Sequence, residues 1–245
     1  MPFKHAAILF LLFTAASAIS HQSGLDQWLA HAIYNLEGGT GPGDGFLLRH
    51  NFWTKTVLHD YGRKLVKRLW FLDVLLFISS FFFQKISRYR GIFLYIAVAT
   101  VVSASLISTL KHLTTIPCPQ SLLEFGGERQ WINIWQIFSP NQPLGKCYPA
   151  GHSSGGYGWL CLAMVFPYRG KAFYWMLLPG TLLGLTFGIT QQLRGAHFLS
   201  HDLLTIALVV FLSATVFYGM QSLSKLKPAI RSFWQGIAES LNSKF

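Results

Sequence analysis

The sequence predicts an all-α fold, a polytopic membrane helical bundle of about six transmembrane helices. Hydrophobic residues make up 51% of the 245 residues and charged residues only 12%, about half the charge of an average globular chain. Apolar runs also recur along the chain more often than the core of one soluble domain requires. We therefore expect a single membrane domain.

The net charge of +11 is spread over short loops and termini. No basic helix with interleaved aromatic residues is present, so the pattern argues against nucleic-acid binding. A cationic membrane protein that meets a phosphorylated lipid would carry the same kind of charge. The expected partners are therefore the bilayer and an anionic lipid.

Residues 1–22 contain an apolar run, Ala6 to Ile19, that follows Lys4. A basic start, a compact apolar centre and small residues at the end are typical of a signal peptide. The same features fit a short first transmembrane span, and we favour a span that is retained. Under both interpretations the following chain begins on the outer side of the membrane.

Residues 23–68 are predicted to form an amphipathic region on the outer face. Apolar residues from Leu25 to Leu36 have helical spacing, as in a helix that lies on a membrane surface. A glycine-rich break at 38–45 separates this helix from a second amphipathic segment, Phe52 to Arg68. The polar residues of this region are expected to be surface or packing residues: His50, His59 and Asp60.

Residues 69–220 are predicted to form the membrane core. Several of its apolar runs are shorter than the roughly 20 residues of an ordinary span, so tilt or local thinning must supply the length. Asp73 lies near the start of the first run and is given no role. The expected spans are 69–84, 91–110, 153–168, 172–190 and 203–220.

The linkers between spans predict the orientation. Residues 84–90 and 168–171 are short, basic and without acidic residues, so they are expected in the cytoplasm together with the tail, 221–245. Short loops weigh most in this rule. Four basic residues on the outer side do not follow it: Arg63, Lys64, Lys67 and Arg68.

This orientation places three polar stretches, 111–119, 147–156 and 194–202, at helix ends on the outer face. We expect the chain in a bacterial inner membrane, with these stretches facing the periplasm. They carry two histidines, His152 and His197. A neutral imidazole can attack phosphorus, and a protonated one can give a proton to a departing oxygen.

The same stretches hold groups that suit an anion. Lys111 and Arg194 could bind a phosphate dianion and offset the charge that builds on its oxygens. The turn that includes Gly151 and Ser153 enters a helix, so its backbone N–H groups favour an anion. Asp202 has no carboxylate neighbour with which to hold a metal ion, so the sequence predicts phosphoryl transfer without a metal or another cofactor.

The three cysteines are Cys118, Cys147 and Cys161. Cys161 lies within an apolar run and is expected to pack there. Cys118 and Cys147 share one long polar loop, and a disulfide between them would staple it if the loop faces an oxidising compartment. Two unpaired thiols are the alternative.

These motifs resemble those of the type-2 phosphatidic acid phosphatase superfamily, integral-membrane lipid phosphatases related in fold to vanadium haloperoxidases. The superfamily motifs read K-x6-R-P, P-S-G-H and S-R-x5-H-x3-D. Here six residues separate Lys111 from Cys118-Pro119, Pro149 to His152 match the second motif, and His197 anchors the third. The resemblance covers residues 91–220. It implies His197 as nucleophile, His152 as general acid and an acidic partner near 201–202.

The sequence departs from this pattern at two cationic positions. Cys118 replaces the arginine of the first motif, and a disulfide to Cys147 would put a structural clamp in its place. Gln191 stands where the third motif has arginine, whereas Arg194 lies three residues before His197. Three residues is nearly one helical turn, so Arg194 remains on about the same face.

Two residues are candidates for the side chain that orients His197. His201 lies four residues after it and Asp202 five. We favour Asp202, because a carboxylate stabilises an imidazolium better than a second imidazole does. Ala150 replaces the serine of the second motif, which leaves the backbone amides in place.

We therefore expect a phosphatase that acts on a lipid phosphate or diphosphate at the outer leaflet. Two alternatives remain. One is a phosphotransferase that passes the phosphoryl group to a second lipid. The other, motivated by Cys118 and Gln191, is a membrane protein that binds anionic lipid with a degenerate site.

Overall fold

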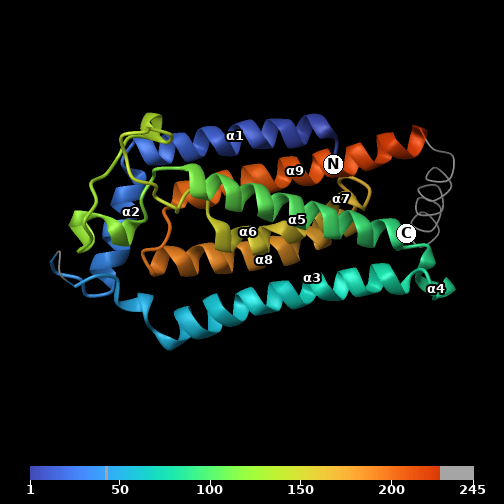
Figure 1. Ribbon diagram of the computed structural model, residues 1–245, viewed down its shortest axis with the longest axis horizontal. Helices are drawn as coiled ribbons and strands as arrows, with labels where there is room; N and C mark the ends of the chain where they lie inside the picture. Colours follow the sequence, from blue (N-terminus) through green and yellow to red (C-terminus); the bar gives the residue numbers. More distant parts are fainter. Residues whose placement is uncertain (42–43, 227–245) are drawn as a thin grey trace.

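The computed structural model describes residues 1–41 and 44–226, and every element in these ranges is helical. The predicted tail beyond residue 226 lies outside the described residues. Figure 1 shows an elongated bundle whose long helices run side by side. The long helices are α1 (Phe3–Gln22), α3 (Gly62–Ser79), α5 (Arg90–Leu113), α8 (Lys171–Leu193) and α9 (Leu199–Leu226). The short ones are α2 (Leu25–Leu36), α4 (Gln84–Ser87), α6 (Gly151–Tyr157) and α7 (Cys161–Met164).

Four of the described helices are long and apolar enough to cross a membrane: α1, α5, α8 and α9. Two other predicted spans differ from this description. Helix α3 is 18 residues long but carries Asp73 and the four basic residues of its first half. The predicted span 153–168 is a short helical stretch in which a 3₁₀ turn, Gly158–Leu160, separates α6 from α7. Glycines at and near this turn weaken the α-helix.

Helix α3 is continuous with a π-helical stretch, η2 (Phe52–Tyr61). The amphipathic segment and the span that the sequence predicted separately, 52–68 and 69–84, are therefore largely one helix that ends at Ser79. Asn51 begins it, because its side-chain oxygen accepts a hydrogen bond from Trp53 N at 2.9 Å. This helix passes from the polar end of the bundle to the opposite end (Figure 1).

Glycines allow α6 to pack very close to α8 inside the bundle. A Cβ on Gly156 would overlap the backbone at Gly184, and one on Gly184 would overlap the ring of Tyr157. A Cβ on Gly188 would lie 2.9 Å from Asp202 Oδ2. Small residues at four-residue spacing bring helix backbones together in this way, and here they fix the start of α6 against α8 and α9.

Helix α1 packs along α9 and is tied to it by buried polar groups. Ser17 Oγ donates to the carbonyl of Ser200 at 2.7 Å. Asp26 accepts hydrogen bonds from Ser20 and from the backbone N–H of Ser200, and it lies 3.3 Å from His21. These contacts fasten α1 and the start of α2 to the first turn of α9.

The three polar stretches lie at one end of the bundle, where α5 ends, α6 begins and α8 leads into α9 (Figure 1). The loop between α5 and α6 covers this end. A disulfide joins Cys118 to Cys147 across the loop, with a Cα–Cα distance of 5.4 Å. Cys161 is a free, buried cysteine in the core.

Candidate active site

A polar cavity of about 370 Å³ opens at this end of the bundle between α3, α5, α6 and α8. Lys111 reaches it from the last turn of α5, and His152 from the first turn of α6. Lys111 lies against the start of α6, since a Cβ on Gly151 would be in ordinary contact with it, 3.8 Å from Nζ. Three of the predicted site residues therefore share one cavity: Lys111, Gly151 and His152.

The ring of His152 lies between two other rings, with centroid distances of 4.6 Å to His59 and 4.8 Å to Phe187. Burial, and then the charge of His59, lowers the pKa of His152 to about 4, although a hydrogen bond with the backbone of Leu58 opposes this shift. Its Nε2 is buried without a hydrogen-bond partner. A ring nitrogen in that state can serve a proton transfer once a substrate arrives.

His197 is buried in the loop between α8 and α9, with 5% of its surface exposed. Its Nδ1 lies 3.2 Å from Nδ1 of His201, so one ring donates a proton and the other accepts it. Burial, followed by the charges of Lys111 and His152, lowers the pKa of His197 to about 3. The imidazole is therefore neutral near pH 7, as a nucleophile must be.

Because the charges of Lys111 and His152 act on the ring of His197, these three residues lie near one another. His197 does not line the polar cavity itself. It borders a much smaller void of about 10 Å³ that Asp26 and Gln192 also line. The predicted nucleophile therefore lies near the predicted general acid and the lysine, outside the lining of the polar cavity.

The family model of the PAP2 superfamily matches residues 91–225, more than half of the chain. The chain belongs to the PAP2 superfamily. No curated protein and no solved structure matches it. PAP2 proteins are generally phosphatases, which supports a phosphoric ester hydrolase with membrane-type helices.

His197, the histidine of the third motif, is hydrogen-bonded to His201. Asp202, the partner that we favoured from the sequence, does not contact it in this way. Asp202 Oδ2 accepts a hydrogen bond from Gln192 Nε2 at 2.8 Å, and the side chain of Ser153 lies beside this carboxylate. Position 202 follows 201 by about 100° around α9, so the two side chains leave the helix in different directions. The carboxylate ties α9 to α8 and α6.

Arg194 is engaged by protein groups at the end of α8. Its Nε donates to the carbonyl of Arg49 at 3.2 Å, and its Nη1 donates to Gln191 Oε1 at 3.0 Å. Its guanidinium still acts electrostatically on His152 and His59, but it does not line the polar cavity. Ser153, whose backbone N–H was another predicted phosphate donor, has a fully buried side chain that faces Asp202.

The sequence interpretation missed the contribution of α3 and η2 to the cavity. His59, Arg63 and Lys67 line it, although His59 was expected to be a surface or packing residue. Their spacing of four residues puts them on one helix face, which is the signal that could have found them. The sequence interpretation also missed Asp26, a buried carboxylate beside His197.

Proposed function

We propose that this protein hydrolyses a lipid phosphate or diphosphate at the outer leaflet of a bacterial inner membrane. One observation carries the proposal: the polar cavity adjoins an apolar groove between α3, α5 and α6. The groove has a volume of about 380 Å³. Both spaces share Val66, Lys67, Ala104, Ser154 and Gly155 as lining residues.

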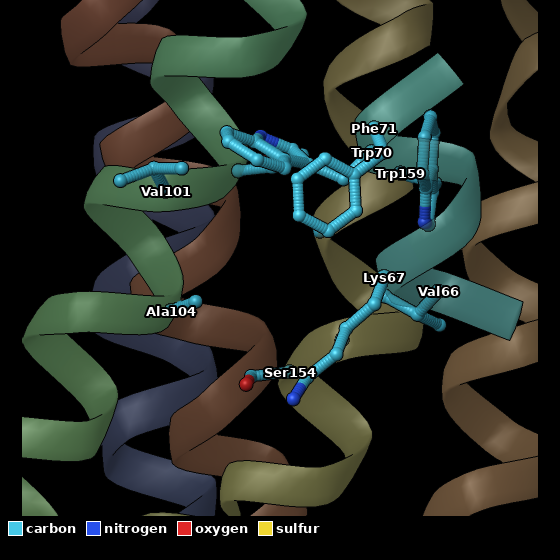
Figure 2. Close-up of a pocket in the computed structure, with 11 residues that line it drawn as sticks. Val66, Lys67, Trp70, Phe71, Val101, Ala104, Ser154 and Trp159 are labelled. Carbon is cyan, nitrogen blue, oxygen red and sulfur yellow. The ribbon is translucent and has the colours of Figure 1, made fainter. Parts of the chain in front are cut away.

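The groove suits a hydrocarbon chain. Figure 2 shows the rings of Trp70, Phe71 and Trp159 around it, with Val101 on the facing helix α5. Lys67 extends from α3 toward Ser154 (Figure 2), and both residues also line the polar cavity. A molecule with a phosphate at one end and an apolar chain at the other matches this change from cationic to apolar lining.

The reaction assigned to this site has two steps. Nδ1 of His197 is engaged by His201, which leaves Nε2 to attack phosphorus. An N–P bond forms, the P–O bond to the leaving group breaks, and protonated His152 gives its proton to the departing oxygen. Water then cleaves the phosphohistidine, with neutral His152 accepting the proton of that water, and phosphate is released. Lys111 offsets the negative charge in both steps.

Phosphate release from micellar phosphatidic acid, in the presence of EDTA, tests this proposal. We expect release by the purified wild type, because histidines and cations carry the chemistry. Loss to background is expected in His197→Ala, with the same elution profile in size-exclusion chromatography. Activity that survives in His197→Ala, or that requires a divalent cation, would contradict the proposal.

A non-catalytic lipid-binding protein is the second candidate. It is favoured by Cys118, which is held in a disulfide where PAP2 proteins have arginine, and by Arg194, whose donors bind Arg49 and Gln191. Phosphatidic acid bound to the wild type without measurable phosphate release would support it.

A further inference from the structure

The face of η2 and α3 that points to the polar cavity carries a stripe of basic residues. His59, Arg63 and Lys67 follow one another at four-residue spacing, and all three line the cavity. Trp70 continues the same face into the apolar groove. The stripe therefore forms the α3 side of the space assigned to the substrate.

The cavity has the charge pattern of an anion site. Its lining residues include Arg63, Lys67 and Lys111 and, within the described part of the chain, no carboxylate. The two cationic positions at which this chain departs from the PAP2 motifs do not supply these charges. Cys118 has no charge, and Arg194 donates to Arg49 and Gln191 away from the cavity lining.

Arg63 is not neutralised by its neighbour Asp60. The closest approach between them is 3.8 Å, and their side chains are 58% and 39% exposed. Such an exposed pair is weak, and Asp60 is also bonded by His59 Nδ1 at 2.9 Å. The guanidinium can therefore turn to a phosphate without breaking a buried ion pair. The side chain of Lys67 extends toward Ser154 (Figure 2), which also lines the polar cavity.

We propose that Arg63 and Lys67 bind the phosphoryl group of the substrate and replace the charge that is lost at Cys118. This assignment rests on the proposed function and identifies α3, outside the region matched by the PAP2 model, as part of the binding site. The planar guanidinium suits two phosphate oxygens at once, and the ammonium acts as a point charge.

Lys64 and Arg68 provide a matched control. They lie on the same helix and carry the same charge, but they do not line either cavity. The full-length protein is purified in detergent as wild type, as Arg63→Gln/Lys67→Gln, and as Lys64→Gln/Arg68→Gln. Affinity for inorganic phosphate is measured by titration calorimetry, and kcat/KM is measured with micellar phosphatidic acid.

We expect the Arg63→Gln/Lys67→Gln variant to bind inorganic phosphate at least about tenfold more weakly, because each charge-assisted contact is worth that much. Its kcat/KM should fall by at least the same factor. The Lys64→Gln/Arg68→Gln variant should match the wild type in both measurements. Arg63→Lys should retain part of the affinity, because it keeps the charge and loses the planar contact.

Equal losses in the two double variants would overturn the inference, since they would reflect overall charge. A loss confined to the lipid, with phosphate binding unchanged, would also overturn it and assign these residues to the membrane surface. Wild-type affinity for phosphate that depends on Arg63 and Lys67, without hydrolysis of phosphatidic acid, would keep this binding site and refute the proposed function.

Discussion

The ring of His197 faces a second imidazole where the PAP2 motif has an aspartate. A carboxylate holds the tautomer of a catalytic histidine and stabilises its charged form. A neutral His201 can hold the tautomer, by fixing which nitrogen of His197 carries the proton, but it does not stabilise the charged form. In the proposed reaction, the positive charge that develops on His197 must therefore be balanced by the negatively charged phosphoryl group itself.

Replacing His201 tests this arrangement at the scale of a residue. His201→Leu removes the hydrogen-bond partner of His197 Nδ1 and keeps much of the side-chain volume. We expect kcat to fall by about 10- to 100-fold, the loss seen when metal-binding histidines lose the residue that orients them. Asp202→Asn should stay near the wild-type kcat, because an amide oxygen can still accept from Gln192. A larger loss in Asp202→Asn than in His201→Leu would show that the carboxylate orients His197.

The pH dependence follows from the two lowered pKa values. His152 must be protonated to act as an acid, and its pKa is about 4. His197 must be neutral, and its pKa is about 3. The fraction of enzyme with both groups correct therefore decreases as pH rises above 4, so kcat/KM should increase from pH 7 to pH 5. An unchanged or decreasing kcat/KM over this interval would contradict these roles.

At the scale of an element, the site depends on how closely α6 approaches α8. His152 lies in the first turn of α6, and three buried residues of that helix face α8 or α9: Ser153, Gly156 and Tyr157. A shift of α6 would move the histidine away from Lys111. The glycines of α8 are therefore part of the positioning of the site.

Gly184→Ala should show this dependence. The added methyl group overlaps the ring of Tyr157, and such overpacking costs about 1–3 kcal/mol. We expect a lower temperature of thermal unfolding in detergent together with a lower kcat. Gly219→Ala in α9 is the control, since a Cβ there meets nothing within 4 Å; equal behaviour of the two variants would refute the close-packing explanation.

Helices with long apolar runs could be predicted from the sequence. The spans 91–110, 172–190 and 203–220 correspond to α5, α8 and α9 within a few residues at most ends. The break between α6 and α7 could not be predicted, because an apolar segment buried inside a bundle has the same sequence pattern as one that faces lipid. The π-helical stretch at 52–61 depends on tertiary packing and leaves no periodic pattern.

At the scale of the whole molecule, the fold brings residues far apart in the chain to one end of the bundle (Figure 1). The motifs predicted His152, His197 and Lys111 because each residue type has a defined chemistry and a fixed spacing. Arg63 and Lys67 carry no motif, and their role depends on how α3 packs against α5 and α6. The partner of His197 depends on the first turn of α9 rather than on spacing alone.

The predicted orientation places this end in the periplasm. Asn141 lies on the loop between α5 and α6, and Lys85 lies in α4 at the opposite end; both are exposed. Asn141→Cys should react with a membrane-impermeant maleimide in intact cells, whereas Lys85→Cys should react only after the inner membrane is permeabilised. The reverse pattern would place the site in the cytoplasm.

The most direct test of the account is to trap the covalent intermediate. Phosphatidic acid carrying a ³²P-labelled phosphate is mixed with the wild type, quenched within a turnover and digested. We predict an acid-labile, base-stable label on the peptide that contains His197, and no label in the correctly folded His197→Ala variant. A label on another residue, or turnover without any phosphohistidine in a trapped sample, would contradict the account.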